Sequence, residues 1–92
     1  MNYLANIIEV SKALSDKNRF NILMLIIKSR EISCKEITKK IKLSQPAISH
    51  HLKILIDSKV VNVRREGQWG YFSLNSKAFN AYLKTLKKEV KL

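Results

Sequence analysis

The stretch between residues 33 and 58 constrains the fold most, because it contains two helix starts separated by a tight turn. Ser33 and Glu36 match a capping box, in which the serine side chain and the glutamate side chain each accept a backbone amide of the other residue. Pro46 suits the first turn of a helix, since the amide hydrogen that proline lacks has no helical partner there. We therefore predict a short helix that ends near Lys40 and a longer one that begins near Pro46.

The longer helix has an apolar face and a polar face. Ser44 or Gln45 caps it, and its apolar residues recur every three or four positions, as on the buried side of a helix. These residues are Ile48, Leu52 and Leu55. The opposite face carries Gln45, Pro46, Ser49, His50, Lys53 and Asp57. Two short helices of this kind indicate a helix-turn-helix over residues 33–58, whose second helix reads the major groove of duplex DNA.

Two more helices are predicted before this segment. Apolar residues at helical spacing predict one over residues 3–14. Ser15 and Asp16 supply a cap and an early acidic residue for another near residues 16–28. We expect this second helix to be the most buried element of the fold. Its expected core residues are Phe20, Leu23, Met24 and Ile27.

After residue 59 apolar residues recur at every second position, which is typical of a strand. A turn at Gly67 separates two such runs, so residues 60–74 are predicted to form a β-hairpin. A last helix follows over residues 76–90. The predicted fold is mainly α with one β-hairpin, in the order α-α-α-α-β-β-α, and it makes residues 1–92 a single winged helix-turn-helix domain.

The chain is strongly basic, with 18 Lys and Arg against 7 Asp and Glu and a net charge of +11. Residues 28–65 alone carry ten positive and three negative side chains. Such a charge favours a polyanionic partner, and nucleic acid is commoner than a membrane surface, although lysines on a surface also serve solubility alone. We therefore predict double-stranded DNA as the partner.

The predicted DNA contacts divide into two sets. Polar side chains on the exposed face of the longer helix can read donors and acceptors at base edges. This base-reading set is Gln45, Ser49, His50 and Lys53. Side chains of the preceding turn and of the hairpin can bind phosphates, which makes the affinity depend on salt. This phosphate-binding set is Lys42, Ser44, Arg64, Arg65 and Gln68.

The single cysteine, Cys34, excludes an internal disulfide, as is typical of a protein of the reducing cytoplasm. The sequence has no recognisable signal peptide. Its longest apolar run, residues 22–27, is far shorter than the roughly 20 residues that span a bilayer. We expect a soluble cytoplasmic protein with no membrane partner.

Three segments can be compared with known families: LSDKNRFNILMLI at 14–26, LSQPAISHHLKIL at 43–55 and VVNVRREGQWGYFSL at 60–74. Together they resemble the ArsR/SmtB family of bacterial transcriptional repressors. The resemblance implies a winged-helix homodimer joined through the helices at 3–14 and 76–90. Such a dimer binds an operator of imperfect inverted repeats and blocks transcription.

The sequence also indicates which side chains form the dimer interface, because apolar stripes at the two ends of so small a domain cannot both be buried within one chain. The expected interface consists of Leu4, Ile7, Ile8, Phe79, Tyr82, Leu83 and Leu86. One departure from the family is Ser58-Lys59, where Ala-Gly is common. A lysine in the left-handed conformation at that helix end costs about 1 kcal/mol, which the fold should survive.

Many family members sense metals, and the resemblance allows each ligand position to be compared. The thiolate site of the third helix usually reads Glu-Leu-Cys-Val-Cys-Asp-Leu, and the aligned residues 31–37 place Ser33 and Lys35 at the two cysteine positions. The dimer-interface site needs Asp and His on the last helix, and residues 76–92 contain neither. We therefore predict no metal and no cofactor. The chain resembles members that lack these sites, such as the SdpR-type repressors.

The adjacent His50 and His51 point about 100° apart on a helix and cannot share a metal ion. We assign His51, which lies nearer the buried face, a structural hydrogen bond. Trp69 in the hairpin is interpreted as a packing residue. No nucleophile with a base, no paired carboxylates and no Gly-rich phosphate loop are present, so we predict that the chain is not an enzyme.

Three alternatives stay open at this stage. The chain is an architectural DNA-binding protein without sequence preference, a protein-interaction module whose helix-turn-helix no longer touches DNA, or a repressor that answers a small-molecule or redox signal. A small molecule would use the apolar stripe of the last helix. A redox signal would act through Cys34. A reversible switch normally needs a second, resolving cysteine, and the chain contains none.

Overall fold

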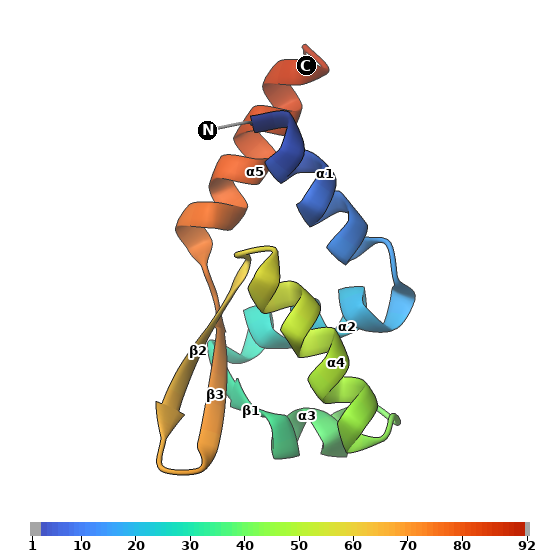
Figure 1. The fold of residues 1–92 in the computed structure, drawn as a ribbon, viewed down its shortest axis with the longest axis vertical. Helices are drawn as coiled ribbons and strands as arrows, with labels where there is room; N and C mark the ends of the chain where they lie inside the picture. The colour runs from blue at the N-terminus through green and yellow to red at the C-terminus, as the bar shows by residue number, and fades with distance from the viewer. Residues whose placement is uncertain (1–2, 92) are drawn as a thin grey trace.

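The computed structural model describes the backbone of residues 3–91 and the side chains of residues 6–91. It confirms the predicted fold class, a mainly helical winged helix-turn-helix, and adds one short strand before the third helix (Figure 1). The elements are α1 (Tyr3–Leu14), α2 (Lys17–Ser29), β1 (Glu31–Ser33), α3 (Cys34–Lys40), α4 (Gln45–Asp57), β2 (Val61–Glu66), β3 (Trp69–Leu74) and α5 (Ser76–Glu89).

The helix starts are those that the sequence predicts. The Ser33 hydroxyl accepts the Glu36 amide at 3.2 Å, and a Glu36 carboxylate oxygen accepts the Ser33 amide at 3.1 Å, so the capping box is complete. Ser44 is the residue that caps α4, since its hydroxyl accepts the Ala47 amide at 3.3 Å, and Pro46 lies in the first turn. Each such cap stabilises its helix by about 1 kcal/mol.

The sheet is antiparallel and has three strands in the order β1-β3-β2. The pair β2–β3 is the predicted hairpin, and β1 joins its other edge by placing Ile32 opposite Phe72. The hairpin turns at Gly67 and Gln68. Gly67 has a φ of 60°, in the left-handed region that favours glycine in tight hairpin turns. We call residues 61–74 the wing.

The core lies between α2, α4 and the inner face of the sheet. The fully buried residues of α2 are Ile22, Leu23 and Ile26. The predicted core of this helix is confirmed at Leu23. It is wrong at the other three positions, because Phe20 is 42% exposed and Met24 and Ile27 are only partly buried. α2 is apolar on several sides, so its periodicity alone does not choose the face that packs. The buried stripe of α4, by contrast, is confirmed at Ile48, Leu52 and Leu55.

The end of α4 adopts the conformation for which the family commonly uses glycine. Lys59 has a φ of 75°, so a lysine occupies the left-handed region after the helix. The neighbouring Ser58 is buried, and its hydroxyl donates to the Leu55 carbonyl at 2.9 Å. This contact satisfies a polar group that burial would otherwise leave unpaired.

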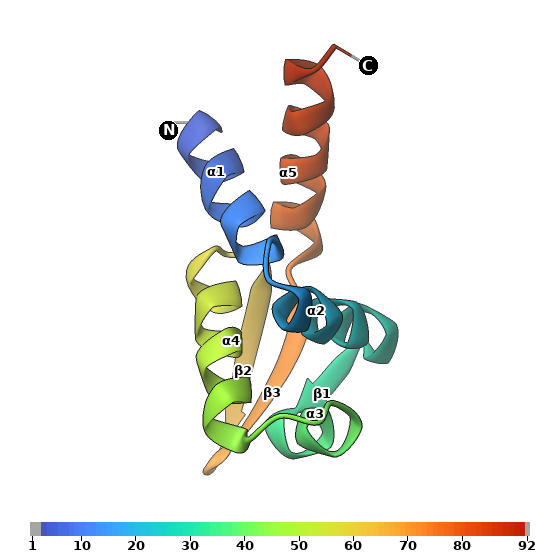
Figure 2. The ribbon, with the colours of Figure 1, turned by 90° about the vertical axis from the view of Figure 1, so that its right-hand side faces the viewer.

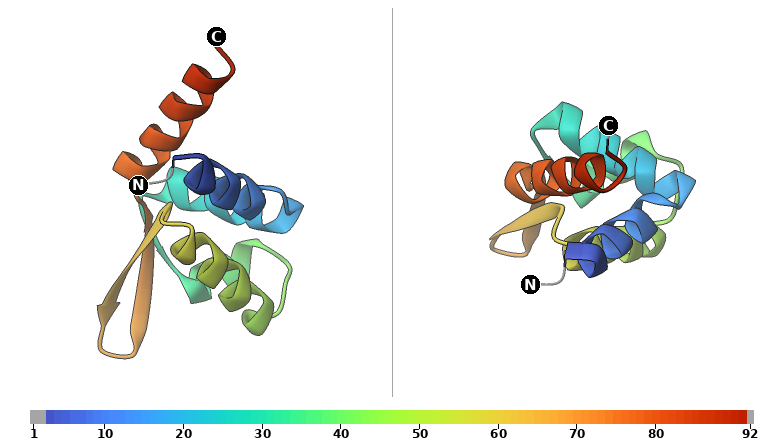
Figure 3. Two further views of the ribbon diagram at one scale, coloured as in Figure 1. Left: turned by 45° about the horizontal axis from the view of Figure 1, so that its top comes forward. Right: turned by 90° about the horizontal axis from the view of Figure 1, so that it is seen from above.

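The molecule measures 41 × 25 × 21 Å, and different secondary-structure elements form its two ends. α1 and α5 lie side by side at one end, together with both chain termini (Figure 2). The tip of the wing, α3 and the start of α4 lie at the other end (Figure 1). The wing projects from the helical body, as the tilted view shows (Figure 3). Within residues 3–91, none of the helices has both the length and the hydrophobicity needed to cross a bilayer.

Candidate nucleic-acid interface

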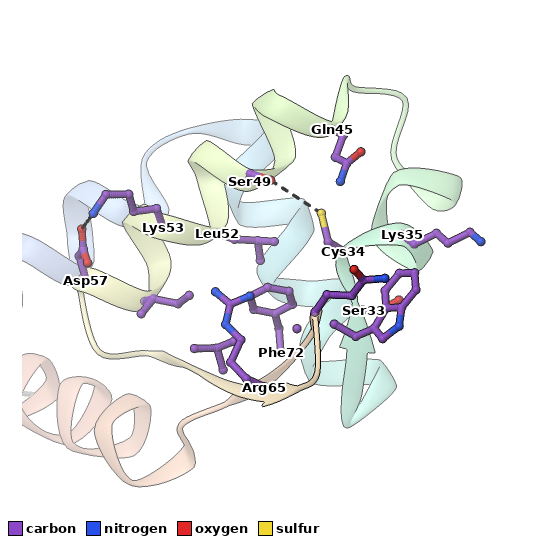
Figure 4. A pocket seen from close by; sticks show the side chains of 15 residues that line it. Ser33, Cys34, Lys35, Gln45, Ser49, Leu52, Lys53, Asp57, Arg65 and Phe72 are labelled. Atoms are coloured by element: carbon purple, nitrogen blue, oxygen red, sulfur yellow. Dashed lines mark hydrogen bonds and ion pairs between the residues drawn. The ribbon is translucent and has the colours of Figure 1, made fainter.

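A groove of about 540 Å³ runs between α4 and the wing (Figure 4). Leu52 of α4 and Phe72 of β3 lie at its apolar base, and polar or basic side chains line its walls. Five residues of the two predicted DNA-binding sets line it: Gln45, Ser49, Lys53, Arg65 and Gln68. The fold thus brings side chains from α4 and from the wing to one concave surface. We call it the α4–wing groove.

The polar face of α4 is open to solvent because the opposite face is held in the core. Gln45, Ser49, His50 and Lys53 are all exposed. His50 does not line the α4–wing groove, since it lies one residue beyond Ser49 and is turned about 100° around the helix. Lys53 Nζ lies 3.1 Å from Asp57 Oδ2, with both side chains mostly exposed. Such a surface pair contributes little to stability.

The two arginines of the wing lie on opposite faces of the hairpin. Arg65 shares the inner face with Phe72 and lines the α4–wing groove. It is paired directly with Gly70, and its Nη1 lies 2.9 Å from the position that a Cβ at residue 70 would take. The absence of a side chain at Gly70 therefore lets the Arg65 guanidinium lie across the neighbouring strand.

Arg64 is bound by acidic and aromatic neighbours on the outer face. Its Nε and Nη2 donate to the two carboxylate oxygens of Glu31 at 3.1 and 2.9 Å, and its Nη1 donates to Glu66 at 2.5 Å. Its guanidinium carbon also lies 4.6 Å from the centre of the Tyr71 ring. The hydrogen bonds that Arg64 donates to Glu31 lower the pKa of Glu31 and raise the pKa of Arg64 further above its usual value. Two carboxylates thus already balance this guanidinium.

The remaining predicted phosphate contacts lie outside the α4–wing groove. Lys42 and Ser44 are exposed in the turn between α3 and α4, where the Ser44 hydroxyl is engaged in the helix cap. Sequence reasoning missed Lys35, which lines the α4–wing groove from the first turn of α3. It also missed Glu31 and Glu66 as partners of Arg64. No local pattern signals Glu31, because β1 reaches the wing only through the sheet. Glu66, by contrast, lies two residues after Arg64 on β2, and this spacing places both side chains on one face of the strand.

The two histidines have different environments, as expected. His51 is partly buried, and its Nδ1 lies 3.2 Å from Arg19 Nη1, which confirms the predicted structural hydrogen bond. Among the residues that the structure describes, no three His, Cys, Asp or Glu side chains gather where they could hold a metal ion. Cys34 is partly buried, and its sulfur lies 3.9 Å from the Ser49 hydroxyl oxygen.

The α1–α5 end holds the predicted dimer residues. Ile8 and Leu83 are 53% and 46% exposed, and no residue of α5 is fully buried within the described chain. Ile7 and Tyr82 line a cavity of about 340 Å³ between the two helices. Phe79, Tyr82 and Leu86 are partly buried. The side chain of Leu4 lies outside the described residues.

The chain can now be compared with known proteins, first by sequence. Residues 16–63 match the model of a family described as bacterial regulatory protein, arsR family. The transcriptional repressor SdpR of Bacillus subtilis is 42% identical over 67 residues, which are 73% of each chain. The transcriptional activator HlyU of Vibrio cholerae is 32% identical over 82 residues, 89% of this chain and 75% of that one.

The solved structure of an ArsR-like transcriptional regulator from Rhodococcus sp. RHA1 has the same fold. It superposes with a TM-score of 0.86 at 24% identity, over 96% of this chain and 82% of that chain. All three relatives are transcriptional regulators rather than enzymes, in agreement with the prediction.

Proposed function

The chain belongs to the ArsR family of bacterial regulatory proteins, a family of DNA-binding transcriptional regulators, and on that premise we propose that it is a homodimeric repressor of an inverted-repeat operator. The relatives include both a repressor and an activator, so the sign of regulation is part of the proposal. Repression follows when the bound dimer covers promoter sequence that the polymerase needs.

The observation that carries the proposal is the arrangement of α4 beside the wing. The exposed face of α4 presents four polar side chains at one end of the molecule, and the α4–wing groove adds Arg65 and Gln68. An α-helix fits the major groove of B-DNA, and a wing beside it reaches the backbone that borders the groove. This placement supports the base-reading roles that we propose for Gln45, Ser49, His50 and Lys53.

The phosphate contacts are proposed for side chains around that helix. Lys42 and Ser44 lie next to the start of α4, and Gln68 lies at the tip of the wing. Of the two wing arginines, Arg65 is the stronger candidate, because Glu31 and Glu66 already bind the Arg64 guanidinium. For Arg64 the phosphate contact stays a prediction, which requires that DNA replace at least one carboxylate.

The proposed dimer uses the opposite end of the molecule. Ile8 and Leu83 expose apolar surface on α1 and α5, and a second copy would cover it. A twofold axis at this end would place two copies of α4 on one side of the dimer, as an inverted repeat requires. Residues 3–14 and 76–90 then serve as dimerisation helices, with the helix-turn-helix at 33–58 and the hairpin at 60–74 as the DNA-binding part.

We propose that the dimer does not respond to metals through the standard family sites. Ser33 and Lys35 replace the thiolates at the third helix, and a single thiolate cannot complete a soft-metal site.

Competition binding tests the function. The protein would be bound to a labelled duplex from the region upstream of the gene, and an excess of unlabelled upstream or scrambled duplex would then be added to measure how well each displaces the label. A sequence-specific repressor should prefer the upstream duplex by at least about 10³. Equal competition by the two duplexes would favour an architectural DNA-binding protein, and the absence of binding to both would favour a protein-interaction module.

A further inference from the structure

One side chain connects the predicted dimer end to the recognition helix. Arg19, in the first turn of α2, donates from Nε to the Ala13 carbonyl at 2.6 Å and from Nη2 to the Lys12 carbonyl at 3.2 Å. Both carbonyls belong to the last turn of α1, where helical partners are missing. The same guanidinium reaches His51 of α4, with Nη1 3.2 Å from Nδ1.

The chemistry of this contact fixes the state of the histidine. Arginine carries donors only, so Nδ1 of His51 must be the acceptor. The ring that makes this hydrogen bond is therefore neutral and carries its proton on Nε2. A doubly protonated ring has no acceptor and would place a positive charge against the guanidinium.

Several charged groups surround the contact. The Asp16 carboxylate accepts the Arg19 amide at 2.9 Å, and this hydrogen bond lowers the pKa of Asp16. Arg19 also borders a cavity of about 220 Å³ whose charged lining residues from α1 and α4 are Glu9, Lys12 and Asp57. The ring of His50 lies 6.0 Å from that of His51.

We propose that Arg19 and His51 are positioning residues that set the angle of α4 to α1, and thereby the separation of the two recognition helices in the dimer. The inference rests on the proposed function, since it requires dimerisation through α1 and base reading by α4. Arg19 joins the last turn of one helix to the middle of the other, so it resists rotation of α4 relative to the dimer end. The DNA property that it controls is the preferred distance between half-sites.

The test compares two substitutions of His51. His51→Asn keeps an acceptor near the position of Nδ1 and cannot gain a proton, whereas His51→Leu keeps the volume and removes the acceptor. Each protein is titrated against duplexes that carry the inverted repeat selected in vitro by the wild type, with the centre-to-centre spacing unchanged or altered by one base pair. Circular dichroism and sedimentation first establish that each variant is a folded dimer.

The wild type and His51→Asn should prefer the original spacing, and His51→Leu should lose this preference by about tenfold, as expected for one hydrogen bond with a charged donor.

The outcomes separate this inference from the function on which it rests. If His51→Leu kept the wild-type spacing preference and only bound every duplex more weakly, His51 would be merely structural and the inference would be overturned. If His51→Asn did not retain the preference, the hydrogen bond would not be the cause. A wild type that bound scrambled DNA as well as the selected repeat would instead contradict the proposed function.

Discussion

Replacing Arg65 with alanine should weaken DNA binding in a way that depends on salt and not on sequence. Arg65 lines the α4–wing groove and makes no ion pair within the described residues, so its charge is available to a phosphate. Neutralising one phosphate contributes about 0.9 to the slope of log K against log salt, so a dimer that loses two contacts should lose about 1.8. A fourfold rise in salt should then weaken the wild type about twelve times more than the variant.

Arg64→Ala is the matched control, because it removes the same charge from the neighbouring residue. Its guanidinium is shared between Glu31 and Glu66, so we expect the slope to change less than half as much as in Arg65→Ala. Both variants should fold. Arg65→Ala breaks no ion pair within the described residues, and exposed ion pairs such as those of Arg64 stabilise a protein by at most about 1 kcal/mol.

Fluorescence anisotropy with an upstream and a scrambled duplex, at salt concentrations from about 50 to about 200 mM, measures the slopes. Arg65→Ala should shift both isotherms by the same factor at each salt concentration. Equal slope changes for the two variants would refute the division between the faces of the wing and would support an equal phosphate contact for Arg64. A loss confined to the upstream duplex would mean that Arg65 reads bases.

Four further predictions follow from other parts of the molecule. Gln45→Ala should cost about 1–3 kcal/mol of binding per half-site on the upstream duplex and leave scrambled DNA nearly unchanged, whereas equal losses on both would exclude base reading by Gln45. Leu83→Lys, which places a charge on the exposed stripe of α5, should give monomers in analytical ultracentrifugation and abolish tight operator binding; a variant that stays dimeric would contradict the interface. Zinc or cadmium titrated into the protein–DNA complex should not release DNA, and stoichiometric release below micromolar metal would disprove this. Ser33→Ala should lower the free energy of unfolding in urea by about 1 kcal/mol. Hydrogen bonds from Ser33 lower the pKa of Glu36 below 4.5, so the stabilisation from that carboxylate is present at neutral pH and should fade as the pH falls below 4.5.

The parts of the fold that the sequence predicts are those determined by neighbours along the chain. The caps at Ser33 and Ser44 act over three residues, and the buried stripe of α4 follows the helical period. The hairpin is likewise local, since its turn needs a residue that tolerates the φ of Gly67. These features depend on short-range geometry, and a single sequence contains all of it.

The features that the sequence does not predict depend on packing between distant segments. β1 has only three residues, too few to show alternation, and it exists because β3 offers an open edge. The face of α2 is selected by what packs on it, and Phe20 is therefore exposed although it has core spacing. Arg19 was missed for the same reason, because its partner on α4 lies 32 residues away.

The two wing arginines illustrate how a small difference in register separates two functions. Arg64 and Arg65 are adjacent and equally charged, so composition cannot distinguish them. Because strand residues alternate between faces, the register that pairs Arg65 with Gly70 sends its guanidinium toward α4 and sends that of Arg64 toward Glu31. A shift of one residue would exchange them and place a bound, balanced guanidinium in the α4–wing groove. The register therefore determines which charge is available to DNA, and Gly70 contributes by leaving space beside Arg65.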